Sequence, residues 1–301
     1  MAHPHGFCAG VRRALEIVKQ AMSDFGAPIY VRHEIVHNRH VVEDLKKEGV
    51  IFIDELSEIK DISRPVVFSA HGVPIKIQEQ AKNMGLNIID ATCPLVTAVH
   101  NKIKKLEAKN AEIIVVGKAT HPEILGTIGQ LQNPKRAHII SSIDEMAALN
   151  FAQTTPVGVV TQTTLSVDDT QEIATALKNN YPHIINGDQL NVCFATTNRQ
   201  KAVKELCRYS PNIIIIGSKN SSNSTHLAET ARRQGAKKVW LVDDYKDLDL
   251  SEIKDADILG ISAGASAPDY LLDELLAFLR KHYDNINIHD VTVVREDISF
   301  K

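Results

Sequence analysis

The chain has 301 residues, enough for two or more domains with a large buried core. Its formal net charge of -3 argues against a nucleic-acid partner, which would need a basic face. No apolar run approaches the roughly 18 residues of a membrane span, and no secretory segment follows Met1, so we expect a cytoplasmic protein without a membrane partner. There the four cysteines are more often ligands, nucleophiles or core residues than disulfides.

Strand-like and helix-like segments alternate along the first third of the chain. The apolar pattern predicts strands at 29–31, 50–53, 65–70 and 86–89, and helices over 12–25, 39–48, 75–84 and 96–109. The segment from Met1 to Gly6 is too short for a complete strand. Such alternation is typical of a parallel sheet with helices on its faces.

The same alternation continues to the end of the chain. It predicts strands at 112–117, 138–140, 156–160, 212–216, 239–242 and 258–262, and helices over 124–131, 168–179, 199–209, 225–234 and 269–281. Ser166 is a suitable N-cap for the second of these helices. The tail from Asn285 is polar and then apolar at 291–294.

Three of the four cysteines stand where a predicted helix begins. Cys93 follows an apolar strand and precedes Pro94, which suits a first helical position. At a helix start the helix dipole favours the thiolate of Cys93 over the thiol. Cys8 and Cys193 share this setting, whereas Cys207 lies inside a predicted helix and is expected to be a core residue.

Cys8, Cys93 and Cys193 divide the chain into three similar lengths. We therefore predict three related α/β units, at 10–93, at 94–192 and at 193–282 together with 1–9, followed by a C-terminal tail at 283–301.

Reactive or hydrogen-bonding residues follow many of the predicted strands. In open α/β sheets, ligands bind outside the carboxyl ends of the strands. Residues of this kind at those ends are His37, His71, Cys93, His121, Glu123, Thr163, Thr164, Cys193, Ser221, Ser222, Asn223 and Ser266. Each could also cap a helix or fill a turn, but their number at one edge favours a binding site.

The hydroxyl-rich loops are typical of anion sites, because backbone N–H groups at a helix start suit phosphate oxygens. The loop at 217–224 lacks a Walker A ending, which disfavours ATP chemistry. Arginines are scarce in these loops, so a diphosphate would be held by neutral donors and protonated histidines. Hydrogen bonds to a charged group contribute roughly 1.5–3 kcal/mol each.

The cysteines and Glu123 leave alternatives open. No Cys-x-x-Cys occurs, but three strand-end cysteines suit an iron–sulfur cluster, and three ligands would leave one iron open. Zinc bound by Cys and His in a phosphate-ester enzyme is an alternative. Glu123 either caps the helix that follows it or acts as a general acid.

Nine motifs occur in one order along the chain. They are Gly6-Phe7-Cys8-Ala9-Gly10-Val11, His37-Asn38, Ser69-Ala70-His71-Gly72-Val73, Asp90-Ala91-Thr92-Cys93-Pro94, His121-Pro122-Glu123, Thr161-Gln162-Thr163-Thr164-Leu165-Ser166, Cys193 through Gln200, Gly217 through Ser224, and Ala263-Gly264-Ala265-Ser266-Ala267-Pro268. From about residue 3 to residue 300 the chain resembles the 4-hydroxy-3-methylbut-2-enyl diphosphate reductases of the non-mevalonate isoprenoid pathway. It departs from their usual pattern in having only Met1-Ala2-His3 before Pro4 and in its short closing tail.

The resemblance implies an α/β trefoil of three similar units with mainly parallel sheets around a central [4Fe-4S] cluster. Cys8, Cys93 and Cys193 would be the ligands. The substrate diphosphate would contact His37, His71, His121, Thr163, Thr164, Ser221, Ser222, Asn223 and Ser266. Glu123 and Thr163 would handle protons.

The activity implied is reductive dehydroxylation of the allylic diphosphate to isopentenyl and dimethylallyl diphosphate, with ferredoxin or flavodoxin as the electron donor. A non-catalytic sensor built on the same cluster remains a rival.

Overall fold

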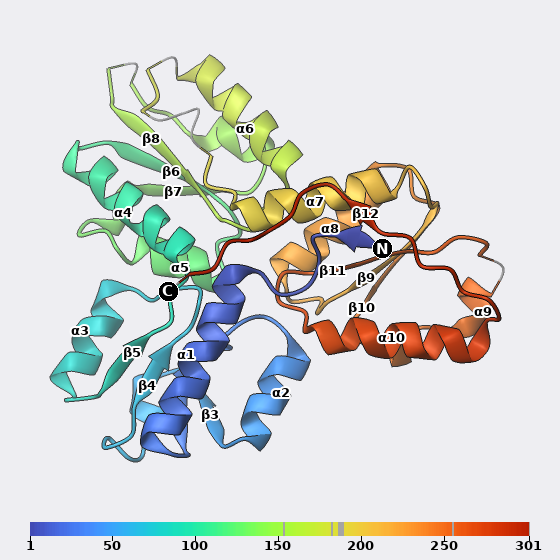
Figure 1. Ribbon diagram of the computed structural model, residues 1–301. Coiled ribbons are helices and arrows are strands. Elements are labelled where there is room, and N and C mark those ends of the chain that lie inside the picture. Colours follow the sequence, from blue (N-terminus) through green and yellow to red (C-terminus); the bar gives the residue numbers. More distant parts are fainter. Residues whose placement is uncertain (153, 182, 186–189, 255, 301) are drawn as a thin grey trace. The chain divides into compact units, whose positions relative to one another are not determined.

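The computed structural model describes residues 1–152, 154–181, 183–185, 190–254 and 256–300. The chain divides into two compact units. The first comprises Met1–Arg12, Val36–Lys47 and Phe194–Lys301, and the second comprises Arg13–Ile35 and Glu48–Cys193. Most helices and strands of both units are labelled in Figure 1.

The second unit contains a parallel sheet in the order β3-β2-β4-β5, made of Val50–Ile53, Ile29–Arg32, Val66–Phe68 and Ile88–Asp90. Val31 in β2 lies between Phe52 and Val67 of its neighbours. Every residue of β2 is buried, as expected for a central parallel strand covered on both faces. Helices α1 (Ala9–Phe25) and α3 (Ile75–Asn83) alternate with these strands along the chain.

A second parallel sheet in this unit has the order β7-β6-β8, from Ala137–Ile140, Glu112–Val116 and Val157–Thr161. Its helices are α4 (Pro94–Ala108), α5 (Pro122–Ile128) and α6 (Val167–Asn180). Alternate residues of β6 point to opposite faces. Ile113 packs in the cluster that includes Ile103 of α4, while Ile114 packs with Ile173 of α6.

The first unit contains the sheet β10-β9-β11, from Lys238–Val242, Asn212–Ile216 and Gly260–Ala263. The helices of this unit are α2 (Arg39–Lys47), α7 (Phe194–Leu206), α8 (Ser222–Arg233), α9 (Leu250–Ile253) and α10 (Asp269–His282). Ile213 packs with residues of α7 and α8, and Ile214 packs with residues of α10. Short 3-10 helices lie at Leu56–Glu58, Pro134–Arg136, Asp144–Ala148 and Tyr245–Asp247.

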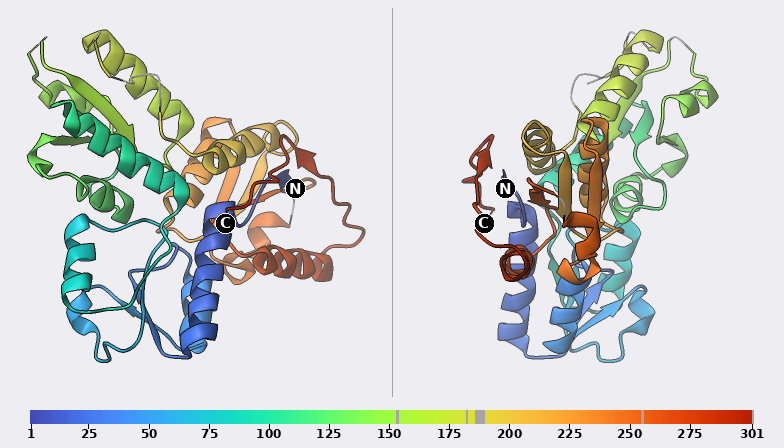
Figure 2. Two further views of the ribbon diagram at one scale, coloured as in Figure 1. Left: turned by 60° about the vertical axis from the view of Figure 1, so that its left-hand side comes forward. Right: turned by 90° about the vertical axis from the view of Figure 1, so that its right-hand side faces the viewer.

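The N-terminal residues form a strand of two residues, β1 (Ala2–His3), consistent with a segment too short for a complete one. It pairs in parallel with β12 (Val291–Thr292) in the C-terminal segment. Figure 2 shows this red segment beside the blue N-terminal end of the chain. The structure therefore gives the predicted tail a place in the first unit.

The α/β fold with parallel sheets is confirmed, and most predicted elements lie within a few residues of the observed ones. Helices α1, α7 and α8 each begin three to five residues earlier than predicted, because the residues of their first turns are mostly polar or small and carry no apolar period. Helix α4 begins at Pro94, the residue expected at a first helical position. Helix α7 ends at Leu206, so the prediction that Cys207 lies inside a helix is wrong. The Cys207 side chain still packs half-buried against the core cluster of Ala202 and Val203.

The proposed division into three units at the cysteines stays a prediction. In the part of the chain that the structure describes, no helix combines the length and the apolar character needed to cross a bilayer.

Candidate functional site

Three cysteines have the same local environment. Cys8, Cys93 and Cys193 each stand directly before a helix, namely α1, α4 and α7. The backbone N–H of each donates to a carbonyl in the loop after a strand: Cys8 to Ala265 at 3.1 Å, Cys93 to Ala70 at 3.1 Å and Cys193 to Thr163 at 3.0 Å. These loops follow β11, β4 and β8, one strand from each sheet of three or four strands described above. The same type of backbone hydrogen bond therefore holds all three cysteines at the start of their helices.

The thiols are chemically suited to bind a metal. Cys8, Cys93 and Cys193 are half-buried and form no disulfide in the described chain. Cys8 belongs to the first unit and the other two to the second. Among the described residues, no group of three or more His, Cys, Asp or Glu side chains is arranged to hold a metal ion. The three-cysteine site therefore stays a proposal, supported by the equivalent settings of its members.

Glu123 is an almost fully buried carboxylic acid in the first turn of α5, with 2% of its surface exposed. Thr163 donates to it twice, from N–H to Oε1 at 2.6 Å and from Oγ1 to Oε2 at 2.8 Å. Burial raises the pKa of Glu123 to about 7, against the two hydrogen bonds, which lower it. Near neutral pH both protonation states are accessible, which is what a general acid requires.

Glu123 lies in the first turn of α5, as the capping alternative expects, but it is not the N-cap residue. The N-cap is His121, whose Nδ1 accepts the backbone N–H of Glu123 at 3.2 Å. Nδ1 accepts only while it carries no proton, so this hydrogen bond fits the ring form with its proton on Nε2.

His71 and His121 lie close together in the second unit. Their ring centroids are 5.7 Å apart in an edge-to-face arrangement. A Cβ atom at Gly126 of α5 would lie 3.0 Å from the Gly72 carbonyl oxygen and 3.3 Å from that of His71. Gly126 therefore lets α5 approach the backbone of the His71 loop closely enough to bring the two rings together.

The predicted serine-rich loops meet in the first unit. Ser221 is the N-cap of α8, and its Oγ lies 3.4 Å from Oγ of Ser266. Ser266 donates to the carbonyl oxygen of His37 at 2.9 Å, so residues from three distant segments converge. Asn223 Oδ1 accepts the N–H of Ala265 at 2.8 Å, and Ala265 in turn accepts the N–H of Cys8.

The start of α2 holds His37 in this loop cluster. Asn38 caps α2 by accepting the N–H of Val41 at 3.1 Å. The N–H of Arg39 donates to Oγ of Ser218 at 3.1 Å. His40 pairs with the buried carboxylate of Asp244 at 3.1 Å.

The structure sorts the predicted site residues into two sets. In the first unit are Cys8, His37, Ser221, Ser222, Asn223 and Ser266, and in the second are Cys93, Cys193, His71, His121, Glu123, Thr163 and Thr164. Ser222 is the first residue of α8.

Sequence reasoning did not single out Gln162 and Arg199. The Gln162 side chain is buried, donating to Thr164 Oγ1 at 2.9 Å and accepting the N–H of Lys118 at 3.2 Å. It therefore orients a predicted substrate contact. Its position between the strand β8 and two threonines is a signal that would have identified it. Arg199, inside α7, carried no such signal.

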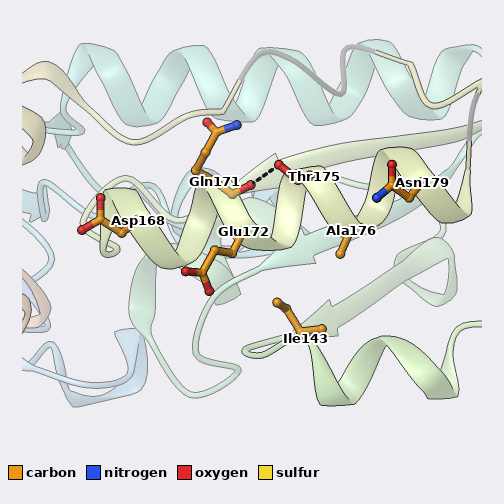
Figure 3. Close-up of a pocket in the computed structure, with 7 residues that line it drawn as sticks. All are labelled: Ile143, Asp168, Gln171, Glu172, Thr175, Ala176 and Asn179. Atoms are coloured by element: carbon orange, nitrogen blue, oxygen red, sulfur yellow. Dashed lines mark hydrogen bonds between the residues drawn. The ribbon is translucent and has the colours of Figure 1, made fainter. Parts of the chain in front are cut away.

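A pocket of about 590 Å³ lies along α6, away from these residues. Figure 3 shows the lining residues Asp168, Gln171, Glu172, Thr175, Ala176 and Asn179 of this helix, with Glu172 and Ala176 on the side toward Ile143. Thr175 Oγ1 donates to the Gln171 carbonyl within the helix at 2.9 Å. None of the lining residues is a predicted site residue, so this pocket is not part of the candidate site.

Comparison with known proteins gives concordant results. Residues 1–280 match the family model described as "LytB protein". Proteins named 4-hydroxy-3-methylbut-2-enyl diphosphate reductase from Enterobacter sp. (strain 638) and Salmonella schwarzengrund are 45% and 46% identical over 282 residues, covering 93% of this chain and 89% of each relative.

Two solved structures are also similar. The E-1-hydroxy-2-methyl-but-2-enyl-4-diphosphate reductase from Plasmodium falciparum has a TM-score of 0.92 at 35% identity, over 98% of this chain and 92% of that one. A structure of (E)-4-hydroxy-3-methyl-but-2-enyl diphosphate reductase has a TM-score of 0.66 at 29% identity, over 93% of this chain and 98% of that one. The chain therefore belongs to the LytB protein family, the oxidoreductases named 4-hydroxy-3-methylbut-2-enyl diphosphate reductase.

Proposed function

We propose that this chain removes the hydroxyl group of (E)-4-hydroxy-3-methylbut-2-enyl diphosphate and yields isopentenyl and dimethylallyl diphosphate. The observation that carries the proposal is the link from acid to thiol. Thr163 binds the buried carboxyl of Glu123 through its N–H and hydroxyl, and its carbonyl accepts the N–H of Cys193. Thr163 therefore binds both the proposed proton donor Glu123 and the backbone of Cys193, a predicted metal ligand.

The cofactor of the proposal is a [4Fe-4S] cluster held by Cys8, Cys93 and Cys193, with one iron left open. Three half-buried thiols in equivalent backbone settings fit this donor set. When bound, the cluster would supply the two electrons and a Lewis-acidic iron for the substrate hydroxyl.

The diphosphate group would bind to the polar loops of the site. The residues proposed as its contacts are His37, His71, His121, Thr163, Thr164, Ser221, Ser222, Asn223 and Ser266. The N-terminus of α8 adds backbone N–H groups and the positive end of the helix dipole. Neutral donors suffice, because several hydrogen bonds to a charged group, each of roughly 1.5–3 kcal/mol, can hold a small anion.

Glu123 is the proposed proton donor. In its protonated form it gives a proton to the departing oxygen, which leaves as water. Thr163 fixes the orientation of the carboxyl group. Two electrons and a second proton complete the balance, and protonation at one or the other end of the allylic carbanion gives the two products. Ferredoxin or flavodoxin is the proposed source of the electrons.

Anaerobic purification followed by iron and sulfide counting and a turnover assay tests this function. We expect a brown protein with about four iron and four sulfide ions per chain, which consumes the substrate with dithionite-reduced viologen. A brown protein that binds the diphosphate without turnover would instead be a sensor. A colourless protein active in air and containing zinc would be a phosphate-ester enzyme. Either result would overturn the proposal.

A further inference from the structure

Arg199 is the largest fully buried side chain in the described part of the chain. It projects from α7 to the loop that carries Cys8. Its Nε and Nη2 donate to the Gly6 carbonyl oxygen at 3.1 and 2.8 Å, and its Nη1 donates to the Ala195 carbonyl at 3.0 Å. One guanidinium group thus joins the loop before Cys8 to the first turn of α7.

The charge of Arg199 is balanced by the C-terminal segment. Glu296 accepts from Nη1 of Arg199 with both carboxylate oxygens, at 3.2 and 3.0 Å, and its Oε1 also accepts from Nδ2 of Asn198 at 3.0 Å. The Arg199 side chain is 1% exposed and that of Glu296 13%. A buried charge that loses its partner costs several kcal/mol, so the position of Arg199 depends on Glu296.

The C-terminal segment contacts the rest of the first unit both before and after Glu296. Before it, Val291 and Val293 donate to the carbonyls of Met1 and His3 at 2.7 and 3.1 Å. After it, the Phe300 ring lies 6.5 Å from that of Phe194, the first residue of α7. In Figure 1 this red segment crosses α7.

The loop before Cys8, called the Cys8 loop below, is held by hydrogen bonds on two sides. On one side, the N–H groups of Gly6 and Cys8 donate to the carbonyls of Ala263 and Ala265 at the end of β11, both at 3.1 Å. On the other side, Arg199 holds the Gly6 carbonyl. Gly6 has a φ of +64°, a left-handed conformation that favours glycine. Release of the Gly6 carbonyl from Arg199 would remove one of the two sets of hydrogen bonds and leave those to Ala263 and Ala265.

We propose that residues 291–300 form a strap that positions the Cys8 thiol. Glu296 is the positioning residue, and it acts through Arg199 on the carbonyl of Gly6. The role of Cys8 as a cluster ligand rests on the proposed function, whereas the effect of the strap on the Cys8 loop does not.

Thiol reactivity in the metal-free protein tests the strap. The rates at which iodoacetamide alkylates Cys8, Cys93 and Cys193 are followed for each peptide by mass spectrometry. In Glu296→Gln we expect Cys8 to react about tenfold faster, equivalent to about 1.4 kcal/mol, with Cys93 and Cys193 as unchanged internal references. Asp297→Asn, an exposed carboxylate one residue away, should behave as wild type. Equal Cys8 rates in wild type and Glu296→Gln would overturn the strap.

A double variant separates positioning from folding stability. Arg199→Met with Glu296→Gln leaves no buried charge at these two positions, so its melting temperature should lie above that of Glu296→Gln. Its Cys8 should remain fast, because nothing replaces the donors to Gly6. A Cys8 rate that returns to the wild-type value would contradict the proposal, even if Glu296→Gln alone fails to fold.

The loaded protein gives an independent readout. After anaerobic reconstitution, iron release to a chelator should be faster from Glu296→Gln than from Asp297→Asn. A wild-type chain that takes up no iron would overturn the proposed function. The alkylation rates of Cys8 would then still test whether the strap positions this thiol. A wild-type enzyme that is active, with Cys8 rates unaffected by Glu296→Gln, would overturn the strap alone.

Discussion

At Glu123 two opposing effects act on one carboxyl group. Burial disfavours its charged form, and the two hydrogen bonds from Thr163 favour it. Burial is the larger effect, because the pKa rises from the ordinary 4.5 to about 7. The residue therefore keeps its proton to a pH at which exposed glutamates have lost theirs.

The first prediction concerns the pH dependence of stability. Between pH 4.5 and about pH 7 the folded chain holds the Glu123 proton and the unfolded chain has released it, so the free energy of unfolding falls as the pH rises. The expected total is on the order of 3 kcal/mol. Glu123→Gln cannot ionise and should lose this contribution. Urea unfolding of both proteins at pH 5 and pH 7.5 measures it, and equal changes in the two would refute the raised pKa.

The second prediction concerns catalysis by the same residue. Glu123→Gln keeps the shape of the side chain but cannot donate a carboxylic proton, so turnover should fall roughly 10²–10⁴-fold. Iron content and diphosphate affinity should stay close to wild type. Steady-state assays with iron analysis check this, and a near-normal rate would remove Glu123 from the proton path.

The third prediction concerns Thr163. Its hydroxyl lowers the pKa of Glu123, so Thr163→Val should raise that pKa above about 7. The decline of kcat on the alkaline side should then move to higher pH. Thr163→Ser keeps the hydroxyl and is the matched control. The pH profiles of kcat for the wild type and the two variants measure this shift. Coincident profiles would show that this hydrogen bond does not set the pKa of Glu123 as the proton donor.

At the level of elements, a close approach between α5 and the His71 loop joins two predicted substrate contacts. Gly126 lies against the carbonyls of His71 and Gly72, and Gln130 of the following turn donates to the Val73 carbonyl at 2.8 Å. The rigid spacing of helix and loop, rather than either histidine alone, sets the distance between the rings.

The fourth prediction tests that spacing. Gly126→Val would push the His71 loop away, at an overpacking cost of about 1–3 kcal/mol, and should raise KM more than it lowers kcat. Leu125→Ala changes the neighbouring residue, which is 53% exposed, and should leave KM unchanged. Kinetics with the diphosphate substrate measure both. An unaltered KM in Gly126→Val would mean that the His71 loop is not a substrate contact.

At the level of the whole molecule, each parallel sheet of three or four strands described above holds one cysteine through a bond from the cysteine N–H to a carbonyl in the loop after a strand. The N–H of Cys207 donates instead to the Val203 carbonyl in α7 at 3.0 Å, and its thiol lies 3.9 Å from the Ala231 carbonyl against the core. This difference separates the candidate ligands from the fourth cysteine.

The fifth prediction follows from it. Single substitutions Cys8→Ser, Cys93→Ser and Cys193→Ser should each reduce iron bound after anaerobic reconstitution to well below the wild-type level, while Cys207→Ser should bind as wild type. Iron and sulfide counting with the visible absorption spectrum measures this. Full iron content in any of the first three would remove that cysteine from the ligand set.

The α/β class and the residues at the strand ends could be predicted from the sequence because they depend on local order. Helix α4 and strand β6, for example, are predicted from the spacing of their apolar residues. The turn between them is a continuous piece of the chain, so it too can be read from the sequence. Helix starts were predicted late, as at α7, because a first turn such as Phe194-Ala195-Thr196-Thr197 has no apolar period.

What the sequence alone determined is the set of chemical groups: three thiols at helix starts, one acid beside a histidine, and hydroxyl-rich loops. Tertiary structure decided what each group does. The pKa of Glu123 depends on burial beside Thr163, forty positions away. The hydrogen bonds to the Gly6 carbonyl depend on Arg199, 193 positions away, and on Glu296 near the C-terminal end of the sequence. Burial and charge balance are set by neighbours in space, and no local pattern of residues records which neighbours those are.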